Sequence, residues 1–486
     1  MIFEGSTYTY LDIAQQVSVI SEQLLKRGIE KGDNVGIILP NCPEFIVFLL
    51  VAAHIGVTLV PQNTTLSCKS IKKAFLSTGV KHIVIWHSLV QEFKECGDMF
   101  SLWLSVGGSQ AKTLSYNQII ENKSRISLNG SRVSAEQPYI LTMTSGSTGT
   151  PKPILLLQKT KIARVLSTVT TYSLSESDVI LAATPLYHSL AERLVLLPLL
   201  IGGTSVLMAG FTPKEWLKTV DNCHVTFTMT VSSQLKQIIH QLNKNEDIAT
   251  SLKCLVSSSE LLDFNLKNKI LARLHCNFYE CYGTSELACV TNISGKVIGK
   301  ELSVGSPLPG VEIEILKKDQ TLAKKGDTGE IICKTPLAFA GYYKQPEVTA
   351  NSMWNEYFCT GDLGRIDEDG FLYFQGRKKD IIVTGGINVY PKDIENVINT
   401  HPKVIESSVI PLPDERLGEI VVAVIATNDG ALPLNELQRL CARELGDFQQ
   451  PKKIMLTDKL PRNAMGKIMK RELVEMYSNF IDKSDV

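Results

Sequence analysis

The first 280 residues alternate between short apolar runs and longer amphipathic segments. Short apolar runs bounded by turn residues are typical of buried strands, whereas apolar residues recurring every three or four positions are typical of helices. The expected helices lie at 11–27, 44–55, 70–77, 161–172 and 190–200. The expected strands lie at 7–11, 34–39, 57–60, 81–86, 139–143, 154–157, 179–181, 204–208, 225–229, 252–256 and 276–280. Residues 105–132 lose this periodicity, and we expect a surface connection there.

Alternating strands and helices predict an α/β fold with parallel sheets covered by helices, in which ligands lie beyond the carboxyl ends of the strands. After residue 305 the pattern changes, because 311–315 and 329–333 alternate apolar and polar residues as antiparallel strands do. We therefore expect a large N-terminal domain at 1–378, made of several subdomains with parallel sheets and a small β unit. A mobile α+β domain is expected at 379–486, with helices at 392–400 and 435–445 and strands at 407–412 and 420–426.

Composition argues against several classes of protein. The chain has 486 residues, too many for one ordinary core, and its 50 basic residues balance 50 acidic ones. We therefore expect neither a nucleic-acid nor a membrane-surface partner. The apolar run at 45–53 is far shorter than the roughly 20 residues of a membrane-spanning helix, so no transmembrane segment is expected. Eleven scattered cysteines without a Cys-x-x-Cys pair, and no signal-peptide pattern, predict reduced thiols and a cytoplasmic location rather than disulfides or zinc.

One loop carries hydrogen-bond donors suited to phosphate. Between the expected strands at 139–143 and 154–157 the chain reads Thr144, Ser145, Gly146, Ser147, Thr148, Gly149, Thr150, Pro151 and Lys152. Small residues let backbone N–H groups approach an anion, while hydroxyls and the ammonium add donors. The loop is not a Walker A motif, because Thr150 and Pro151 separate Gly149 from Lys152. The alternative is a flexible linker, although linkers rarely lie between two buried strands.

A second motif follows the expected strand at 276–280. It reads Tyr282, Gly283, Thr284, Ser285 and Glu286. An aromatic ring can stack on a base, hydroxyls can reach a phosphate, and a carboxylate can hold Mg²⁺. The alternative interpretation of the run is a plain turn.

A carboxylate and a guanidinium form a third candidate pair. Asp362 is expected just after a strand that begins near Tyr357, and Arg377 follows fifteen residues later. A carboxylate that accepts hydrogen bonds from vicinal hydroxyls is a common way to hold a ribose, and a planar guanidinium suits the same sugar or a phosphate. The alternatives are an Asp-Gly turn and a surface arginine.

The C-terminal domain adds two further candidates. Lys467 follows Gly466 and is expected to open the last helix, where a lysine is ordinarily solvated. Gly385 and Gly386 lie in the run 383–391 and permit close approach of a slim ligand to the backbone. A tight hairpin is the alternative for this run.

Together these motifs resemble, in order and spacing, those of the adenylate-forming superfamily, which contains acyl-CoA synthetases, firefly luciferase and the adenylation domains of peptide synthetases. The resemblance extends from Tyr8 to about Leu473 and covers nearly the whole chain. It implies that 144–152 binds the phosphates of ATP and that Thr144 and Glu286 are ligands of magnesium. The implied nucleotide contacts are Ser259, Tyr282 on adenine, Gly283, Thr284, Ser285 at phosphate, Asp362 and Arg377 at ribose, and Phe374.

The resemblance makes Lys467 the catalytic lysine of the adenylation step. A carboxylate must approach a polyphosphate, and a mobile ammonium between these two anions reduces their repulsion and stabilises the transition state. Gly385 and Gly386 would line the tunnel for the thiol acceptor, and Lys379 stands at the position of the family's hinge. The small domain would therefore present different faces in the two half-reactions.

Some residues depart from the family pattern, and others have two alternative interpretations. His188 matches a histidine that in relatives often lies beside the substrate carboxylate, although a core histidine is the alternative. The charged pair Glu192 and Arg193 follows it and is either an internal ion pair or a substrate-recognition feature. The run 257–260 carries serines and Glu260 where relatives have small residues, which puts a simple fatty-acid substrate in doubt. Pro153 replaces a glycine.

The resemblance predicts an ATP-dependent carboxylate–CoA ligase. Its cofactors and substrates would be ATP, Mg²⁺, coenzyme A and a small carboxylic acid. The alternative is a stand-alone adenylation enzyme that loads an acyl or amino acid onto the phosphopantetheine of a separate carrier protein.

Overall fold

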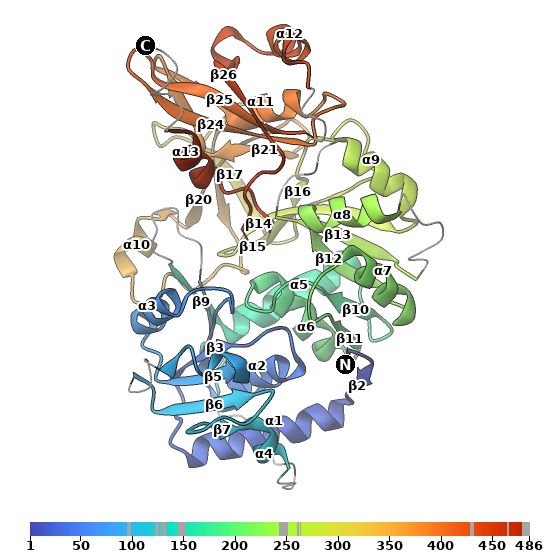
Figure 1. The fold of residues 1–486 in the computed structure, drawn as a ribbon, viewed down its shortest axis with the longest axis vertical. Helices are drawn as coiled ribbons and strands as arrows, with labels where there is room; N and C mark the ends of the chain where they lie inside the picture. The colour runs from blue at the N-terminus through green and yellow to red at the C-terminus, as the bar shows by residue number, and fades with distance from the viewer. Residues whose placement is uncertain are drawn as a thin grey trace.

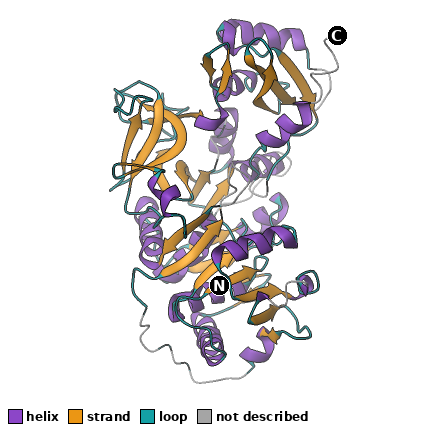
Figure 2. Cartoon of the chain, turned by 90° about the vertical axis from the view of Figure 1, so that its left-hand side faces the viewer, coloured by secondary structure: helices purple, strands orange, loops and turns teal. Residues whose placement is uncertain are grey.

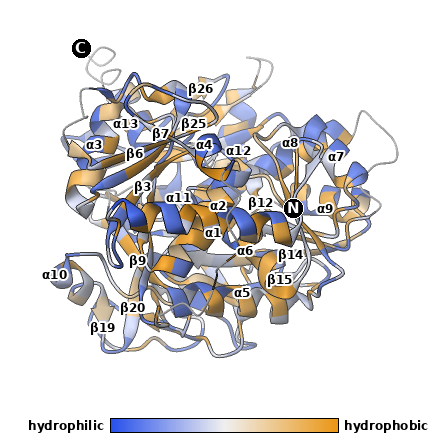
Figure 3. Cartoon of the chain, turned by 90° about the horizontal axis from the view of Figure 1, so that it is seen from below, coloured by the Kyte–Doolittle hydropathy of each residue, from blue (hydrophilic) through white to orange (hydrophobic). Residues whose placement is uncertain are grey.

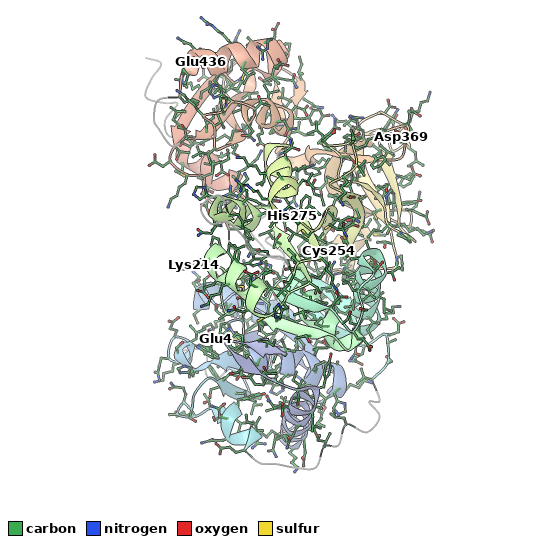
Figure 4. All side chains as sticks on the ribbon, turned by 90° about the vertical axis from the view of Figure 1, so that its right-hand side faces the viewer. Glu4, Lys214, Cys254, His275, Asp369 and Glu436 are labelled. Atoms are coloured by element: carbon green, nitrogen blue, oxygen red, sulfur yellow. The ribbon has the colours of Figure 1, made fainter. Side chains whose placement is uncertain are left out.

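The structure is a computed structural model that describes residues 1–94, 99–121, 126, 128, 133–143, 152–242, 251–259, 262, 264–427, 432–463 and 466–478. Two large sheets form the lower part of the molecule in Figure 1, and a β unit and a C-terminal domain lie above them. Figure 2 shows the strands of these upper parts as two separate groups. In Figure 4, Glu436 marks the C-terminal domain, Asp369 the β unit and Glu4 the lower half of the molecule. The predicted α/β fold with a large N-terminal and a smaller C-terminal domain is confirmed.

The first sheet is parallel except at one edge. Its strands are β3 (Asn34–Ile38), β4 (Thr58–Pro61), β5 (His82–Trp86), β6 (Leu102–Val106), β7 (Leu114–Ser115), β8 (Pro138–Met143) and β9 (Pro153–Leu157). Their order is β7-β6-β5-β3-β4-β8-β9, and only the β8–β9 pair is antiparallel among these strands. The helical segments of this region are α1 (Tyr10–Lys26), α2 (Pro43–Ile55), α3 (Cys68–Thr78), η1 (His87–Leu89) and α4 (Tyr116–Ile120). The β8–β9 hairpin places the ends of the predicted phosphate loop on adjacent strands.

The second sheet carries most of the candidate site. Its strands are β1 (Ile2–Phe3), β2 (Ser6–Thr7), β10 (Val179–Ala182), β11 (Thr204–Leu207), β12 (Phe227–Val231), β13 (Cys254–Ser258), β14 (Asn277–Thr284), β15 (Ala288–Ser294) and β16 (Ser306–Pro307). They follow the order β16-β15-β14-β13-β12-β10-β11-β1-β2. The helices between them are α5 (Gln158–Tyr172), α6 (Ser189–Ile201), α7 (Pro213–Asn222), α8 (Ser232–Leu242) and α9 (Phe264–Arg273). Strands β10 to β14 are parallel, so their carboxyl ends meet at one edge.

Helix α2 is buried on all sides because almost every position is apolar. Phe45, Ile46 and Phe48 are 0–1% exposed, and Gly56, at φ 78°, ends the helix in the left-handed conformation. Figure 3 shows the apolar colour along α2. Together with α1 and α6 it contributes to one apolar core that contacts strands of both large sheets. This shared core joins the two sheets into one rigid support for the site.

The β unit and the C-terminal domain are smaller and mostly antiparallel. The β unit contains β17 (Glu312–Leu316), β18 (Gly329–Lys334), α10 (Pro346–Ala350), β19 (Met353–Trp354), β20 (Tyr357–Ile366) and β21 (Leu372–Arg377). The C-terminal part contains η3 (Lys378–Asp380), β22 (Ile382–Thr384), β23 (Ile387–Val389), α11 (Pro391–Ile398), β24 (Glu406–Asp414), β25 (Gly418–Ala426), α12 (Leu434–Glu444), η4 (Asp447–Gln449), β26 (Lys453–Thr457) and α13 (Lys470–Ser478). Within the C-terminal sheet, only β26 pairs in parallel, with β25.

Two expectations about local structure were wrong. Residues 7–11 do not form one strand, because Thr9 caps α1: its hydroxyl accepts from the Asp12 N–H, and the Asp12 carboxylate accepts from the Thr9 N–H. The region 105–132 is not wholly a surface connection, because it contains the end of β6, β7 and α4. Tyr116 of α4 is 1% exposed and donates to Gln16 of α1.

Two features bear on the environment of the protein. No helix among the described residues is long and apolar enough to cross a membrane. The ten cysteines within the described ranges form no disulfide bond with one another.

Candidate active site

A pocket lies where the ends of β13 and β14 meet β20, β21 and the chain before α13. It is lined by Ser257, Ser259, Glu280, Cys281, Tyr282, Gly283, Val304, Asp362, Phe374, Arg377 and Lys467. We call it the Lys467 pocket. It encloses about 580 Å³ of space between protein atoms, part of it open to solvent, which is within the usual range of ligand sites. Seven residues predicted from separate motifs therefore share one cavity: Ser259, Tyr282, Gly283, Asp362, Phe374, Arg377 and Lys467.

Strand pairing brings Asp362 and Arg377 together. Asp362 lies within β20, not after it as expected, and pairs in register with Arg377 at the end of β21. The Arg377 Nε lies 3.3 Å from Asp362 Oδ1, close enough for an ion pair but without hydrogen-bond geometry, and the Tyr282 hydroxyl donates to Asp362 Oδ2 at 2.8 Å. Burial raises the pKa of Asp362, although Arg377 and Tyr282 oppose the shift. Asp362 thus lines the pocket with one carboxylate oxygen, Oδ1, that accepts no hydrogen bond from the described residues.

Tyr282 and Gly283 are held by the sheet itself. Strand β14 continues through Thr284, so the expected strand at 276–280 was too short. The rings of Tyr282 and Phe374 lie 6.0 Å apart on one side of the pocket. A Cβ on Gly283 would lie 1.7 Å from the Ala288 carbonyl oxygen, so only glycine allows this approach of β14 to β15. The aromatic side of the pocket is therefore fixed by backbone geometry.

Glu286 lies near the end of the phosphate loop rather than on the pocket wall. Its Oε1 accepts from the Tyr342 hydroxyl at 3.0 Å, and Lys152 Nζ lies 5.1 Å from the centre of the Tyr342 ring. Residues 144–151 lie outside the described residues, as does Glu260. Tyr342 thus connects Glu286 to the one described residue of the loop. Thr284 accepts from the Leu287 N–H, and Ser285 is exposed.

Arg164 of α5 was missed by the sequence analysis. It is 2% exposed and donates from Nε to the Leu337 carbonyl at 2.9 Å, from Nη2 to that of Glu286 at 2.7 Å and from Nη1 to that of Ser285 at 3.2 Å. Burial lowers the pKa of Arg164 to about 9. The arginine therefore fixes the backbone of the 282–286 motif. Its only signal in the sequence is a charge on the apolar face of the expected helix 161–172.

Lys467 enters the pocket from a tight loop. Helix α13 begins at Lys470 and not at Lys467 as expected. The Lys467 N–H donates to Asn463 Oδ1 at 2.9 Å. Gly466 has φ 74°, and a Cβ there would lie 2.0 Å from the Ser233 hydroxyl of α8. Arg462 holds the loop by donating to the Gly466 carbonyl and to Glu406. The loop therefore lies against α8 at a point where only glycine fits.

His188 and the glycine pair are not among the residues that line the Lys467 pocket. His188 is the N-cap residue of α6, and the centre of its ring lies 4.4 Å from that of Tyr187. Its Nε2 has no hydrogen-bond partner among the described residues. Burial lowers the pKa of His188 to about 4, so the ring is neutral at pH 7. Gly385 and Gly386 form the turn of the β22–β23 hairpin with φ 56° and 81°, and neither lines the pocket.

Comparison with known proteins identifies the family of the chain. The family model described as AMP-binding enzyme matches residues 1–343, and the model of the AMP-binding enzyme C-terminal domain matches 393–467. The chain belongs to the AMP-binding enzyme family. The adenylate-forming resemblance inferred from the motifs is thereby confirmed.

Relatives of known activity match over nearly their full length. The chain is 28% identical to a 2-succinylbenzoate–CoA ligase of Geobacillus sp. (strain WCH70), over 97% of this chain and 93% of that protein. The crystal structure of ATP-bound MatB from Rhodopseudomonas palustris matches with a TM-score of 0.90 and 26% identity, over 98% of this chain and 95% of that one. The o-succinylbenzoate CoA synthetase MenE from Bacillus subtilis, in complex with its acyl-adenylate intermediate, matches with a TM-score of 0.86 and 25% identity, over 97% and 94%.

Proposed function

We propose that this AMP-binding enzyme is an ATP-dependent carboxylate–CoA ligase. The acid attacks the α-phosphate of ATP to give acyl-AMP and pyrophosphate, and the thiol of coenzyme A then displaces AMP to give the thioester. The observation that carries the proposal is the position of Lys467 in one pocket with Asp362, Arg377 and Tyr282. An ammonium, a hydroxyl-binding carboxylate and an aromatic ring are the groups that an adenylation reaction requires.

In the adenylation step each side chain would have a separate task. Tyr282 would pack on adenine, while Asp362 would accept from the ribose hydroxyls through the oxygen that has no hydrogen-bond partner among the described residues. The Lys467 ammonium would stand between the attacking carboxylate and the phosphate and stabilise charge that develops on the phosphate oxygens. The neutral His188 at the start of α6 would lie toward the acid. Proton transfer has little part in this step.

Magnesium is the metal that the family implies, and the donors present fit it. Mg²⁺ prefers one or two carboxylates together with phosphate oxygens. Glu286 offers a carboxylate whose Oε1 is already oriented by Tyr342, and the Tyr342 ring also lies beside Lys152, the described end of the predicted phosphate loop. When bound, the ion would supply charge neutralisation at the pyrophosphate. Tyr342 and Arg164 would orient Glu286 for this role from its side chain and its backbone.

The thioester step would use another face of the small domain. We take Lys379, in the short helix η3, as the hinge between domains at 1–378 and 379–486. Rotation there would withdraw Lys467 and bring the Gly385–Gly386 turn to the pocket, where its missing side chains leave room for the pantetheine arm. A cytoplasmic location belongs to the same proposal, since the described cysteines form no disulfide bond with one another.

The decisive test is exchange of labelled pyrophosphate into ATP across a panel of aliphatic, aryl and amino acids. The proposal predicts exchange with at least one acid and none without acid. The acceptor is then identified by comparing coenzyme A with a phosphopantetheinylated carrier protein. If the thioester forms only on the carrier protein and not on coenzyme A, the protein is a stand-alone adenylation enzyme and not a CoA ligase. Absence of exchange with every acid would overturn the proposed function.

A further inference from the structure

A second, smaller cavity lies between helices α5 and α6 and strand β15. Arg164 and Arg193 both line it, and Met229, Leu308 and Leu337 form its apolar walls. We call it the Arg193 pocket. Arg193 is on α6, five residues after His188, in the helix that resemblance to the family places beside the acyl group.

The charges around this pocket do not balance. Lys161, Arg164, Arg193 and Glu192 are 4%, 2%, 7% and 0% exposed, which gives three buried cations and one buried anion. Glu192 pairs with Lys161 at 2.5 Å between Oε2 and Nζ. The internal ion pair suggested by the sequence therefore exists, but its cation is Lys161 and not Arg193.

Arg193 is the cation of this cluster that lacks a partner. All three donating positions of Arg164 reach backbone carbonyls, as described above. In contrast, the Arg193 Nε has no hydrogen-bond partner, and no ion pair links Arg193 to any of the described residues. Burying a guanidinium without a counter-charge is strongly unfavourable. The pocket is thus complementary to an anion that the described part of the chain does not supply.

The Arg193 pocket adjoins the Lys467 pocket where strands β14 and β15 pair. Gly283 of β14 lines the Lys467 pocket and pairs in register with Cys289 of β15, which lines the Arg193 pocket, while Cys281 of β14 also lines the Lys467 pocket. The charge of Arg193 acts on both thiols. One molecule could therefore present one end at Lys467 and its other end at Arg193, with an apolar spacer between them.

We infer that the Arg193 pocket binds a second carboxylate of the acid that the enzyme activates. This inference rests on the proposed ligase function and narrows its substrate class to dicarboxylic acids. One carboxylate becomes adenylated beside Lys467. The other forms an ion pair with Arg193, whose apolar surroundings favour a hydrocarbon spacer. A guanidinium suits this task because it binds a carboxylate with two parallel hydrogen bonds.

The test compares dicarboxylic acids of four to eight carbons with their monomethyl esters in the pyrophosphate exchange assay. Each pair has almost the same length and shape but differs in the distal charge. For the best chain length, kcat/KM is expected to be about 100-fold higher for the diacid than for its ester. An ester as good as its diacid at every length would overturn the inference. Exchange with monocarboxylic acids alone would do the same while leaving the ligase function intact.

Substitution of Arg193 then assigns the discrimination to this residue. Arg193→Gln is expected to bring the diacid-to-ester ratio close to one, and Arg193→Lys to restore part of it. The ratio compares two substrates of one protein, so it is independent of the fraction of folded enzyme. Arg273→Gln, an exposed arginine on α9, is the matched control and should keep the wild-type ratio. An unchanged ratio in Arg193→Gln would overturn the role of Arg193. If the wild-type protein shows no pyrophosphate exchange with any acid, the ligase function itself is refuted.

Discussion

The Lys467 pocket and the Arg193 pocket are neighbours, but they are built in different ways. The first takes its side chains from strand ends and a loop, and its pairs are set by backbone register, as with Asp362 and Arg377. The second lies between two helices and is defined by buried charges at separate positions, Arg164 and Arg193. The polarity of the Arg193 pocket depends on which of these buried charges form ion pairs, and not on a contiguous sequence motif.

This difference in construction matches the difference between the two ligands, the nucleotide and the acid. A nucleotide is the same in every member of a family, so a site fixed by glycines and strand pairing can serve all of them. The acid differs between relatives, and a pocket of side chains on two packed helices can change without disturbing the sheet. We therefore expect changes around the Lys467 pocket to alter catalysis, and changes around the Arg193 pocket to alter substrate choice.

The largest effect is expected for Lys467→Ala. Loss of the ammonium should lower pyrophosphate exchange about 1000-fold, since removal of one preorganised charge from a transition state has effects of this order. Thioester formation from supplied acyl-AMP should stay within about threefold of wild type, because the ammonium acts only on the first step. Lys459→Ala, at an exposed position in the same domain, is the control. Equal losses in both half-reactions would contradict the separate tasks of the two domain faces.

Arg164→Met should cost the protein stability as well as activity. It leaves the carbonyls of Ser285, Glu286 and Leu337 without their donor and should lower the free energy of unfolding by about 3–4 kcal/mol. Urea unfolding followed by tryptophan fluorescence measures this change. Arg273→Met, which removes an exposed arginine, should change the free energy by less than about 0.5 kcal/mol. If Arg164→Met unfolds at the same urea concentration as the wild-type protein, the arginine does not stabilise the 282–286 motif.

His188 should make stability depend on pH. Its pKa is about 4 in the folded protein and about 6.5 when unfolded, so between these values the unfolded chain binds more protons. The stability contributed by the neutral ring is complete above pH 6.5 and is lost as the pH falls to 4, by about 3 kcal/mol. His188→Gln should flatten the curve of unfolding free energy in this range, and His275→Gln, an exposed control, should not. Parallel curves for wild type and His188→Gln would refute the burial of a neutral imidazole.

The sequence allowed a good prediction of the elements, because they depend on local patterns. It also allowed a prediction of the residues that meet in the Lys467 pocket, because their motifs resemble those of the adenylate-forming superfamily. Strands β3, β5, β8 and β10 begin within one residue of their expected positions. The missed strand β6 contains Ser105, a buried polar residue that bonds to the Gly108 carbonyl, and Gly107 follows it closely. These polar and small residues hide the strand from an analysis of periodicity.

The Arg193 pocket could not be predicted in the same way. The sequence drew attention to Glu192 and Arg193, but adjacent residues on a helix point in different directions. Only the packing of α5 on α6 shows that Glu192 meets Lys161 and that Arg193 is left facing a cavity. The role of Arg164 could not be predicted for the same reason, because its carbonyl partners lie more than 100 residues away in the chain.

The most direct test of the central claim is to fix the C-terminal domain on α8. Lys236 of α8 and Glu406 of β24 lie on the two sides of this contact, with 3.9 Å between Nζ and Oε2. The variant Lys236→Cys/Glu406→Cys can be joined by a bis-methanethiosulfonate linker, whose disulfides a reductant cleaves. In the linked protein we predict that pyrophosphate exchange continues while thioester formation from acyl-AMP stops, and that the reductant restores the second step. Continued thioester formation in the linked protein, or loss of exchange that the reductant reverses, would contradict it.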